Sequence, residues 1–451
     1  MSSKFNIDVA RTRSRFYRIV IVVIINCSLV IAGIIPGKWM LFSSFLFVSI
    51  ILINFSSFDL IKSTILLFVF NGIMRRLAAS DSGYFTSNDM LILLPYIPIV
   101  ILWIKNIREF KFDSQLKVFL SFVFFFALLN IQSSPPNIMW GLLNLLLAIV
   151  LGQISQKFIN DGLLKFIARI GLVVSIYIFY QKISLPYFDL GWCLSRKSNL
   201  IILESCFGSS TRLWGTMESS VNMASFLTVC FFIIAFRSSA LIRSRTRMFQ
   251  LLILFVAIFL TGTRTFIFIL PIVYVATTFK FRRISIPKLV FISLIIAFGA
   301  SLLPSLALLF NYQDRWVDRL NIKNLSGDQS LQDRFFLVSS FDNQVSFRNL
   351  LVGDGIGSKS RGLTAIDNGF LSLVLEIGLP LSLFLLYFVV RRLTSIQILD
   401  NPVLTQCWSA CALMFFANFS YVVFTGSSSI YFWLFLFMLG SKDELRRING
   451  L

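Results

Sequence analysis

The chain has 451 residues, of which 57% are hydrophobic and 14% are charged, and it carries a net charge of +20 at pH 7. Soluble domains contain roughly 45–50% apolar and ~25% charged residues, so the composition excludes a soluble globular fold, a disordered chain and a small disulfide scaffold. The sequence contains no His, which excludes Ser-His-Asp triads, Cys-His dyads and His-ligated metals.

Long apolar runs follow one another along the chain. Runs of ~17–25 apolar residues cross a bilayer as helices, and candidates lie at 18–35, 39–55, 58–74, 90–104, 116–131, 138–156, 166–181, 221–236, 248–262, 265–279, 287–311, 368–390, 405–424 and 430–440. Several are short, so we expect about 12–14 spans. The runs lack the alternation of a β-barrel. The sequence predicts an all-α polytopic membrane protein, and its first span is expected to be a retained signal anchor.

The distribution of Lys and Arg predicts the orientation of these spans. If the Arg-rich N-terminus is cytoplasmic and the spans alternate, 26 of the 41 Lys and Arg residues fall on the inner side and 15 on the outer side. Both termini are then cytoplasmic, and nucleic acid is not needed as a partner to explain the basic charge. Two long outer loops, 182–220 and 312–367, form a cap on a single membrane domain that covers residues 1–451.

Several arginines break this inner bias and are expected on the outer side next to lipid: Arg75, Arg76, Arg212 and Arg264. The segment from Leu260 to Phe266 is a polar break in an apolar region, which predicts a tight turn that holds Arg264 at the surface. The planar guanidinium fork suits phosphate oxygens, so a lipid pyrophosphate is a candidate ligand. The alternative is that these arginines snorkel, or pair with Glu204, Glu218 or a lipid head group.

The second outer loop has charges of both signs, which is typical of a solvated cap. Asp367, just before the span that starts near 368, is a candidate helix N-cap. Glu376, two turns further on, should face protein or a water-filled cavity. The Gly353–Gly357 segment does not follow a strand, so it is not a dinucleotide-binding fingerprint.

The cysteines divide by location. Those in predicted spans are interpreted as small buried hydrophobes, with no metal site expected: Cys27, Cys230, Cys407 and Cys411. Cys193 and Cys206 both lie in the first outer loop, where they either form a disulfide or remain as two thiols.

Three stretches of the second half resemble the O-antigen ligase/polymerase superfamily of bacterial envelope glycosyltransferases. "RLWGTMESSVNMASFL" is similar to the family's R-x-x-G-T-x-x-x-x-N pattern, with Arg212, Gly215, Thr216 and Asn222 matching. "LTGTRTFIFIL" is similar to its T-x-S-R segment through Arg264. "GDGIGSKSRGLTAIDNGFLSLVLEIGLP" is similar to G-x-G-x…H-N-x-(Y/F)-L…E-x-G, with Asn368, Phe370, Leu371, Glu376 and Gly378 matching. The resemblance covers about residues 205–390.

The resemblance implies a metal-independent and cofactor-independent inverting glycosyl transfer from an undecaprenyl-pyrophosphate-linked glycan. It implies a GT-C-like scaffold in the bacterial inner membrane, among membrane lipids, with a chain-length regulator and a flippase as candidate protein partners. Ligases of the family place a His before the matched Asn, whereas this chain has Asp367. A polymerase is therefore favoured over a ligase that transfers to another acceptor.

The chemistry of this transfer constrains the residues. Without a metal, the charge that develops on the leaving pyrophosphate must be met by Arg or Lys, and Arg264 is the first candidate. An acceptor hydroxyl needs at most a general base, for which Asp367 ranks before Glu376 and Glu218. The expected substrate-binding residues are Arg212, Arg334, Arg361, Asn368, Glu376, Arg75, Arg76 and Asn222. A flippase for lipid-linked sugars would use similar arginines, but such transporters usually show internal repeats and midplane polar sites.

Overall fold

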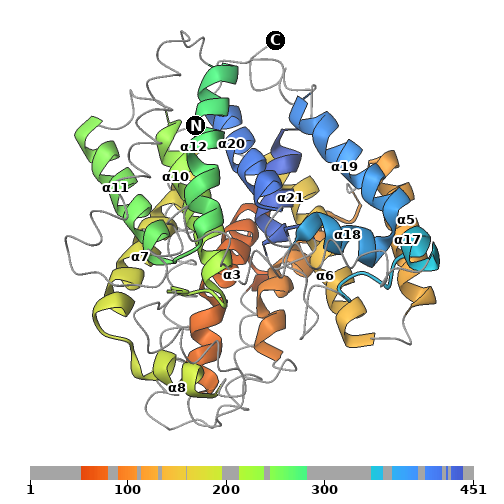
Figure 1. Cartoon of the computed structure of the whole chain (residues 1–451), viewed down its shortest axis with the longest axis horizontal. Coiled ribbons are helices and arrows are strands. Elements are labelled where there is room, and N and C mark those ends of the chain that lie inside the picture. Colours follow the sequence, from red (N-terminus) through yellow and green to blue (C-terminus); the bar gives the residue numbers. More distant parts are fainter. Residues whose placement is uncertain are drawn as a thin grey trace, which may run out of the picture. The chain divides into compact units, whose positions relative to one another are not determined.

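The computed structural model describes residues 52–79, 90–108, 113–130, 135–158, 160–195, 213–237, 244–281, 347–358, 368–394, 402–418, 423–424 and 428–439. All regular elements in these ranges are helices (Figure 1). Three of them are long and apolar enough to cross a membrane, namely Ser57–Leu77, Asn137–Phe158 and Asp161–Ile183. The expectation of an all-helical membrane protein is confirmed at this level. Contacts between Cα atoms divide the chain into two compact units, which are described separately.

The first unit comprises Met1–Phe110 and Lys165–Met223. Its described elements are α3 (Ser57–Ala79), η1 (Met90–Tyr96), α4 (Ile97–Asn106), α7 (Asp161–Ile183) from Lys165 onward, and α8 (Tyr187–Ser195). Helix α3 packs against η1, α4 and α8. Its first turn is closed by Ser56, whose hydroxyl donates to Asp59 Oδ2 at 2.6 Å and accepts from the Asp59 N–H at 3.2 Å, in the manner of a capping box.

The second unit comprises Lys111–Leu164 and Ala224–Leu451. Its described elements are α5 (Ser114–Leu129), α6 (Pro135–Ser155), η2 (Gln156–Phe158), α10 (Ser220–Ala235) from Ala224 onward, α11 (Ser244–Leu260), α12 (Arg264–Phe281), α17 (Phe347–Val352), α18 (Gly369–Ile377), α19 (Leu379–Thr394), α20 (Pro402–Ala417) and α21 (Ser429–Met438). Every residue of α21 is buried, and this helix packs against α6 and α20. A helix that is apolar all round belongs at the centre of a bundle.

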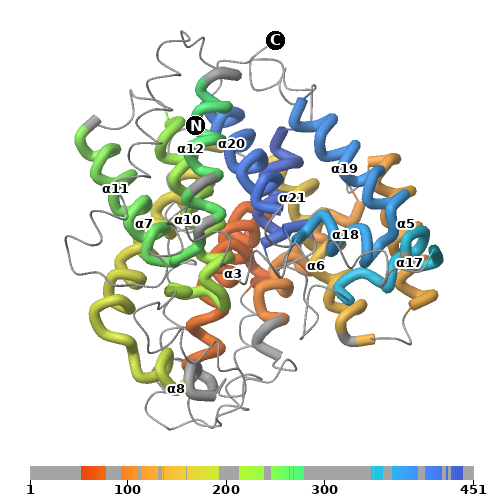
Figure 2. Tube along the Cα trace, in the orientation of Figure 1, coloured from red at the N-terminus to blue at the C-terminus, as the bar shows by residue number. Residues whose placement is uncertain are grey.

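The described helices follow most of the apolar runs, but two of the runs are divided. The run 90–104 forms η1 and then α4. The run 368–390 was expected to form one span, but it forms α18 and α19, which are separated at Gly378 (Figure 2). Gly378 ends α18 with a φ of 80°, outside the helical region. A Cβ atom there would lie 2.2 Å from the Leu351 carbonyl oxygen, so only Gly fits at this position. The predicted first outer loop, 182–220, contains α8.

Other expectations fall outside the described residues. These are the spans 18–35 and 287–311, nearly all of 39–55, and most of the second outer loop, of which only α17 and the turn after it are described. The buried positions of Cys230, Cys407 and Cys411 confirm their interpretation as small core residues.

Candidate functional site

The first motif forms a turn that packs against α3. Gly215 has a φ of 56°, a conformation that favours Gly. The next residue, Thr216, donates its hydroxyl to the Val69 carbonyl at 2.8 Å, and its own carbonyl accepts the Ile73 N–H at 2.8 Å. A Cβ atom on Gly72 would lie 2.2 Å from the Met217 carbonyl carbon. Gly72 thus lets the backbone of the turn lie directly on the helix.

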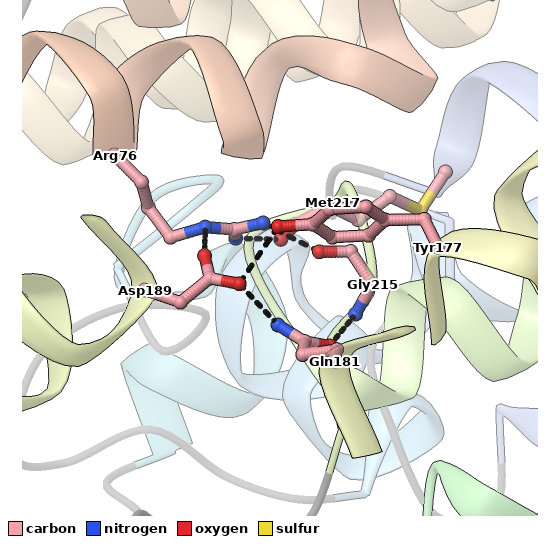
Figure 3. Close-up of polar contacts among 6 residues, drawn as sticks. All are labelled: Arg76, Tyr177, Gln181, Asp189, Gly215 and Met217. Atoms are coloured by element: carbon pink, nitrogen blue, oxygen red, sulfur yellow. Dashed lines mark hydrogen bonds and ion pairs between the residues drawn. The ribbon is translucent and has the colours of Figure 1, made fainter. Parts of the chain in front are cut away.

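The Arg76 side chain binds the same turn (Figure 3). Its side chain is 1% exposed, and its Nε lies 2.6 Å from Oδ1 of Asp189, which is fully buried in α8. The two terminal nitrogens donate to the carbonyls of Met217, at 2.6 Å, and Gly215, at 2.5 Å. One guanidinium group therefore binds a carboxylate and two backbone carbonyls, which its planar fork of donors allows.

Two side chains of α7 complete this network. Oδ2 of Asp189 accepts from the Tyr177 hydroxyl at 2.8 Å and from Gln181 Nε2 at 2.7 Å. The Gln181 side-chain oxygen in turn accepts the Gly215 N–H at 3.0 Å. Both backbone polar groups of Gly215 are thereby bonded to buried side chains, and the turn is fixed to α3, α7 and α8 together (Figure 3).

Arg75 is held in a second pair. Its guanidinium contacts Glu218, whose carboxylate also accepts from Asn71 Nδ2 at 3.3 Å. Arg75 and Arg76 were candidates for binding an anion at the outer surface. The structure instead places both in internal ion pairs, and the pairing with Glu218 is one of the alternatives that the sequence left open. Asn222 lies in the first turn of α10, where its N–H bonds to the Ser219 hydroxyl at 3.2 Å.

The second motif connects α11 to α12 by the tight turn that its composition predicts. The turn covers Thr261 to Thr263, and Gly262 has a φ of 64°. The Thr261 hydroxyl donates to the Ile258 carbonyl at 2.6 Å, and both threonines are buried. Arg264 is the first residue of α12. Its backbone is therefore fixed at a helix N-terminus directly after a buried turn, while its side chain is not among those described.

The third motif is a glycine-rich turn against the end of α18. The N–H groups of Asp354 and Gly355 donate to the carbonyls of Leu375, at 2.7 Å, and Glu376, at 3.0 Å. A Cβ atom on Gly353 would lie 2.4 Å from that Glu376 oxygen. The Gly353 carbonyl accepts from Asn130 Nδ2 at 3.2 Å. The turn is therefore hydrogen-bonded to α18 and to the end of α5, and it is not a free surface loop.

The turn also approaches α6 closely. A Cβ atom on Gly357 would lie 2.3 Å from the Asn137 carbonyl oxygen, and one on Gly141 would lie 2.7 Å from the Gly357 nitrogen. The two backbones meet through a pair of glycines, as close approach requires.

Asn368 and Glu376 both lie on α18, at its two ends. Asn368 is the N-cap, and its side-chain oxygen accepts from the N–H groups of Phe370 and Leu371 at 3.1 Å each. The cap predicted at Asp367 is therefore wrong by one residue, because Asn fills this role as well as Asp does. Glu376 is fully buried, as expected for a carboxylate that faces protein, and it accepts from the Ser372 hydroxyl at 3.2 Å.

The left-handed glycines of the described chain all fall in the three motifs: Gly215, Gly262, Gly353, Gly355, Gly357 and Gly378. Each motif thus contains at least one backbone position that side chains other than Gly rarely adopt. The three stretches that carry the family resemblance are also the stretches with the most specific backbone geometry.

The remaining predicted residues lie outside the described parts of the chain: Arg212, Arg334, Arg361, Asp367, Glu204 and Cys206. Nothing is described of the Cys193 side chain either, so the proposed disulfide stays a prediction. Among the described residues, no group of three or more His, Cys, Asp or Glu side chains is arranged to hold a metal ion.

Sequence reasoning did not identify Tyr177, Gln181 and Asp189. One signal was present, since Asp189 is an acid within the largely apolar stretch "YFDLGW", and such residues usually have a partner. The partner could not be named, because Asp189 and Arg76 are far apart in the sequence.

Comparisons with family models, with curated proteins and with solved structures find no match to this chain.

Proposed function

We propose that the protein is a glycosyltransferase that polymerises undecaprenyl-pyrophosphate-linked oligosaccharide repeat units into O-antigen, capsule or exopolysaccharide. It would act at the outer face of the bacterial inner membrane, on a GT-C-like scaffold of about 12–14 spans. The observation that carries this proposal is the coincidence of the three family-like motifs with the left-handed glycine positions. These glycines fix the backbone that follows Arg212, that precedes Arg264 and that is hydrogen-bonded to α18, whose N-cap is Asn368, which supports a role for the three motifs in positioning those residues.

In the proposed reaction, a hydroxyl oxygen of the acceptor glycan attacks the anomeric carbon of the lipid-linked glycan from the opposite face. The bond between that carbon and the pyrophosphate oxygen breaks, and the configuration inverts. The hydroxyl proton passes to Asp367. Arg264 stabilises the negative charge on the leaving pyrophosphate, as a preorganised donor does in a site from which water is excluded. Three further arginines contribute to stabilising the same negative charge: Arg212, Arg334 and Arg361.

The contacts in the two units refine the choice of base. Glu218 is engaged by Arg75 and Asn71, and Glu376 is buried and bonded to Ser372. Glu218 is a weak base because the Arg75 guanidinium stabilises its ionised form, and Glu376 is fully buried, out of reach of an acceptor hydroxyl. Asp367 is the remaining candidate, and the helix cap beside it belongs to Asn368.

Arg75 and Arg76 take a different role in the proposal. Because Arg76 binds the carbonyls of Gly215 and Met217, we assign it to positioning the turn that follows Arg212 in the chain. Arg75 supports the same turn through Glu218.

The decisive experiment uses purified protein and lipid-linked repeat units, with polymer ladders on a gel normalised to protein. Wild-type protein should form ladders without added metal. Arg264→Ala should insert in the membrane and express but form none, and Arg264→Lys should also lose most activity because Lys lacks the bidentate fork. Ladders of wild-type length from Arg264→Ala would refute the assignment. A flippase would be indicated instead if a deletion strain traps single repeat units inside the cell, whereas a polymerase deletion displays them outside.

A further inference from the structure

A groove of about 460 Å³ lies between α5 and α6, wholly within the second unit. Val123 and Phe124 of α5 and Leu142 and Leu145 of α6 form most of its apolar lining. Val123 and Leu145 are buried at the floor, whereas the Phe124 ring is 55% exposed at the rim. A hydrocarbon chain could enter such a groove from the side and cover apolar surface on both helices.

The exposed face of α5 beside the groove is also apolar. Phe122, Phe125, Leu128 and Leu129 are each about half exposed, and a face of this kind is suited to lipid chains and unsuited to water. The helix is one of the apolar helices of the chain, and Lys117 is its one charged residue.

Lys117 gives the groove a positive end. It lines the groove together with Ser121, and its side chain is exposed. Asp113, one turn earlier, does not neutralise it, because Arg392 contacts the Asp113 carboxylate at 3.3 Å and the other carboxylate oxygen caps α5 by accepting the Gln115 N–H at 3.1 Å. Lys117 also lies in the first turn of α5, where the helix dipole adds positive potential.

We propose that this groove binds a phospholipid with an anionic head group, with one acyl chain between α5 and α6 and the phosphate at Lys117. The proposal is independent of the glycosyl transfer, because no residue assigned to that reaction lines the groove. It commits to a membrane phospholipid and not to the lipid-linked glycan, although both carry phosphate on a hydrocarbon chain.

The test measures lipid retained by the full-length protein, using native mass spectrometry after exchange into detergent with phosphatidylglycerol or phosphatidylcholine. Wild-type protein should retain phosphatidylglycerol preferentially. Lys117→Gln should weaken phosphatidylglycerol binding about fivefold, because it removes the cation that lines the groove, and leave phosphatidylcholine unchanged. Arg245→Gln, which removes an exposed cation from α11, is the matched control and should change neither. Equal retention of both lipids by wild type, or an unchanged preference in Lys117→Gln, would overturn the proposal.

A second measurement identifies the occupant directly and needs no disruptive substitution. A photoreactive phenylalanine analogue at Phe124 should acquire the mass of one phosphatidylglycerol on illumination, and undecaprenyl phosphate at equal concentration should not displace it. A crosslink to another segment of the chain, or displacement by undecaprenyl phosphate, would assign the groove to a different occupant and reject the proposal. The same analogue at Leu128, outside the groove but exposed on α5, should label without preference for lipid type.

Discussion

Arg76 holds a full positive charge at a site that is 1% exposed to solvent. Such a charge is tolerable only if it is paired and its donors are bonded. Asp189 neutralises it, two backbone carbonyls accept from it, and the Trp214 ring lies 6.0 Å from the guanidinium carbon. The ion pair thereby fixes the turn of the first motif, because the two carbonyls that Arg76 binds belong to that turn.

The first prediction compares two members of this network, Asp189 and Tyr177. Asp189→Asn keeps the shape but leaves Arg76 without a counter-charge, so we expect a loss of about 3–5 kcal/mol in unfolding free energy. Tyr177→Phe removes one donor to a carboxylate that Gln181 still bonds, so the loss should be about 1 kcal/mol. Thermal unfolding in detergent measures both. Equal losses would show that the charge itself is not what stabilises the turn.

The second prediction separates Asp367 from Asn368. Asn368→Ala removes the N-cap of α18 and should cost about 1 kcal/mol, whereas Asn368→Asp should retain stability. Because the cap is assigned to Asn368, Asp367→Asn should leave the unfolding temperature unchanged and abolish the polymer ladder. If Asp367→Asn keeps its ladder, the residue is not the general base.

Among the elements, α3 shows how one small residue permits a tertiary contact. The turn of the first motif can reach the backbone of α3 only because Gly72 has no side chain. Gly in a helix normally costs about 1 kcal/mol relative to Ala, and here the contacts of Thr216 with Val69 and Ile73 offset that cost.

The third prediction compares two helical glycines. Gly72→Ala would place a Cβ atom 2.2 Å from the Met217 backbone, so either α3 or the turn must move, and we expect a loss of both stability and polymerisation. Gly191→Ala in α8 meets nothing within 4 Å, and it should be neutral or stabilising by up to ~1 kcal/mol. The two variants carry the same added methyl group. A similar fall in unfolding temperature in both would mean that close packing at Gly72 is not the cause.

Helices could be predicted from the sequence more completely than the site could. Apolar runs predicted α7, α10 and α11 within a few residues, because a continuous apolar stretch has few alternatives in a membrane. The break at Gly378 has a signal in the sequence, because Gly followed two residues later by Pro380 is typical of a helix end. The close approach of the Leu351 carbonyl could not be predicted, since it comes from another segment. The partner of Arg76 could not be predicted either, since a guanidinium can bind a phosphate or the carboxylate of an Asp that is distant in the sequence.

At the scale of the whole molecule, backbone geometry determines the conformation of the motif turns, whereas the distribution of positive charge predicts the side of the membrane on which they lie. The motif turns are defined locally inside each unit by glycines and hydrogen bonds. Their side of the membrane depends instead on the uneven division of Lys and Arg between the two sides. The proposed reaction requires both, because a lipid pyrophosphate must meet Arg264 on the outer side.

The last prediction therefore tests orientation. We expect both termini in the cytoplasm and residues 312–367 outside, from the 26 inner and 15 outer Lys and Arg residues. Cysteines introduced one at a time at Ser3 and Ser340 are probed with a membrane-impermeant maleimide in intact spheroplasts. Ser340→Cys should label at once, and Ser3→Cys only after the membrane is permeabilised.

The background for this labelling keeps the fully buried thiols of Cys230, Cys407 and Cys411, which a water-soluble reagent does not reach, and replaces the other three cysteines by Ala. Retaining the buried thiols avoids cavities that would lower stability, so a failure to label reports orientation and not unfolding. If Ser340→Cys labels only after permeabilisation, the loop is cytoplasmic, and Asp367 and Arg264 cannot meet an outer-leaflet pyrophosphate.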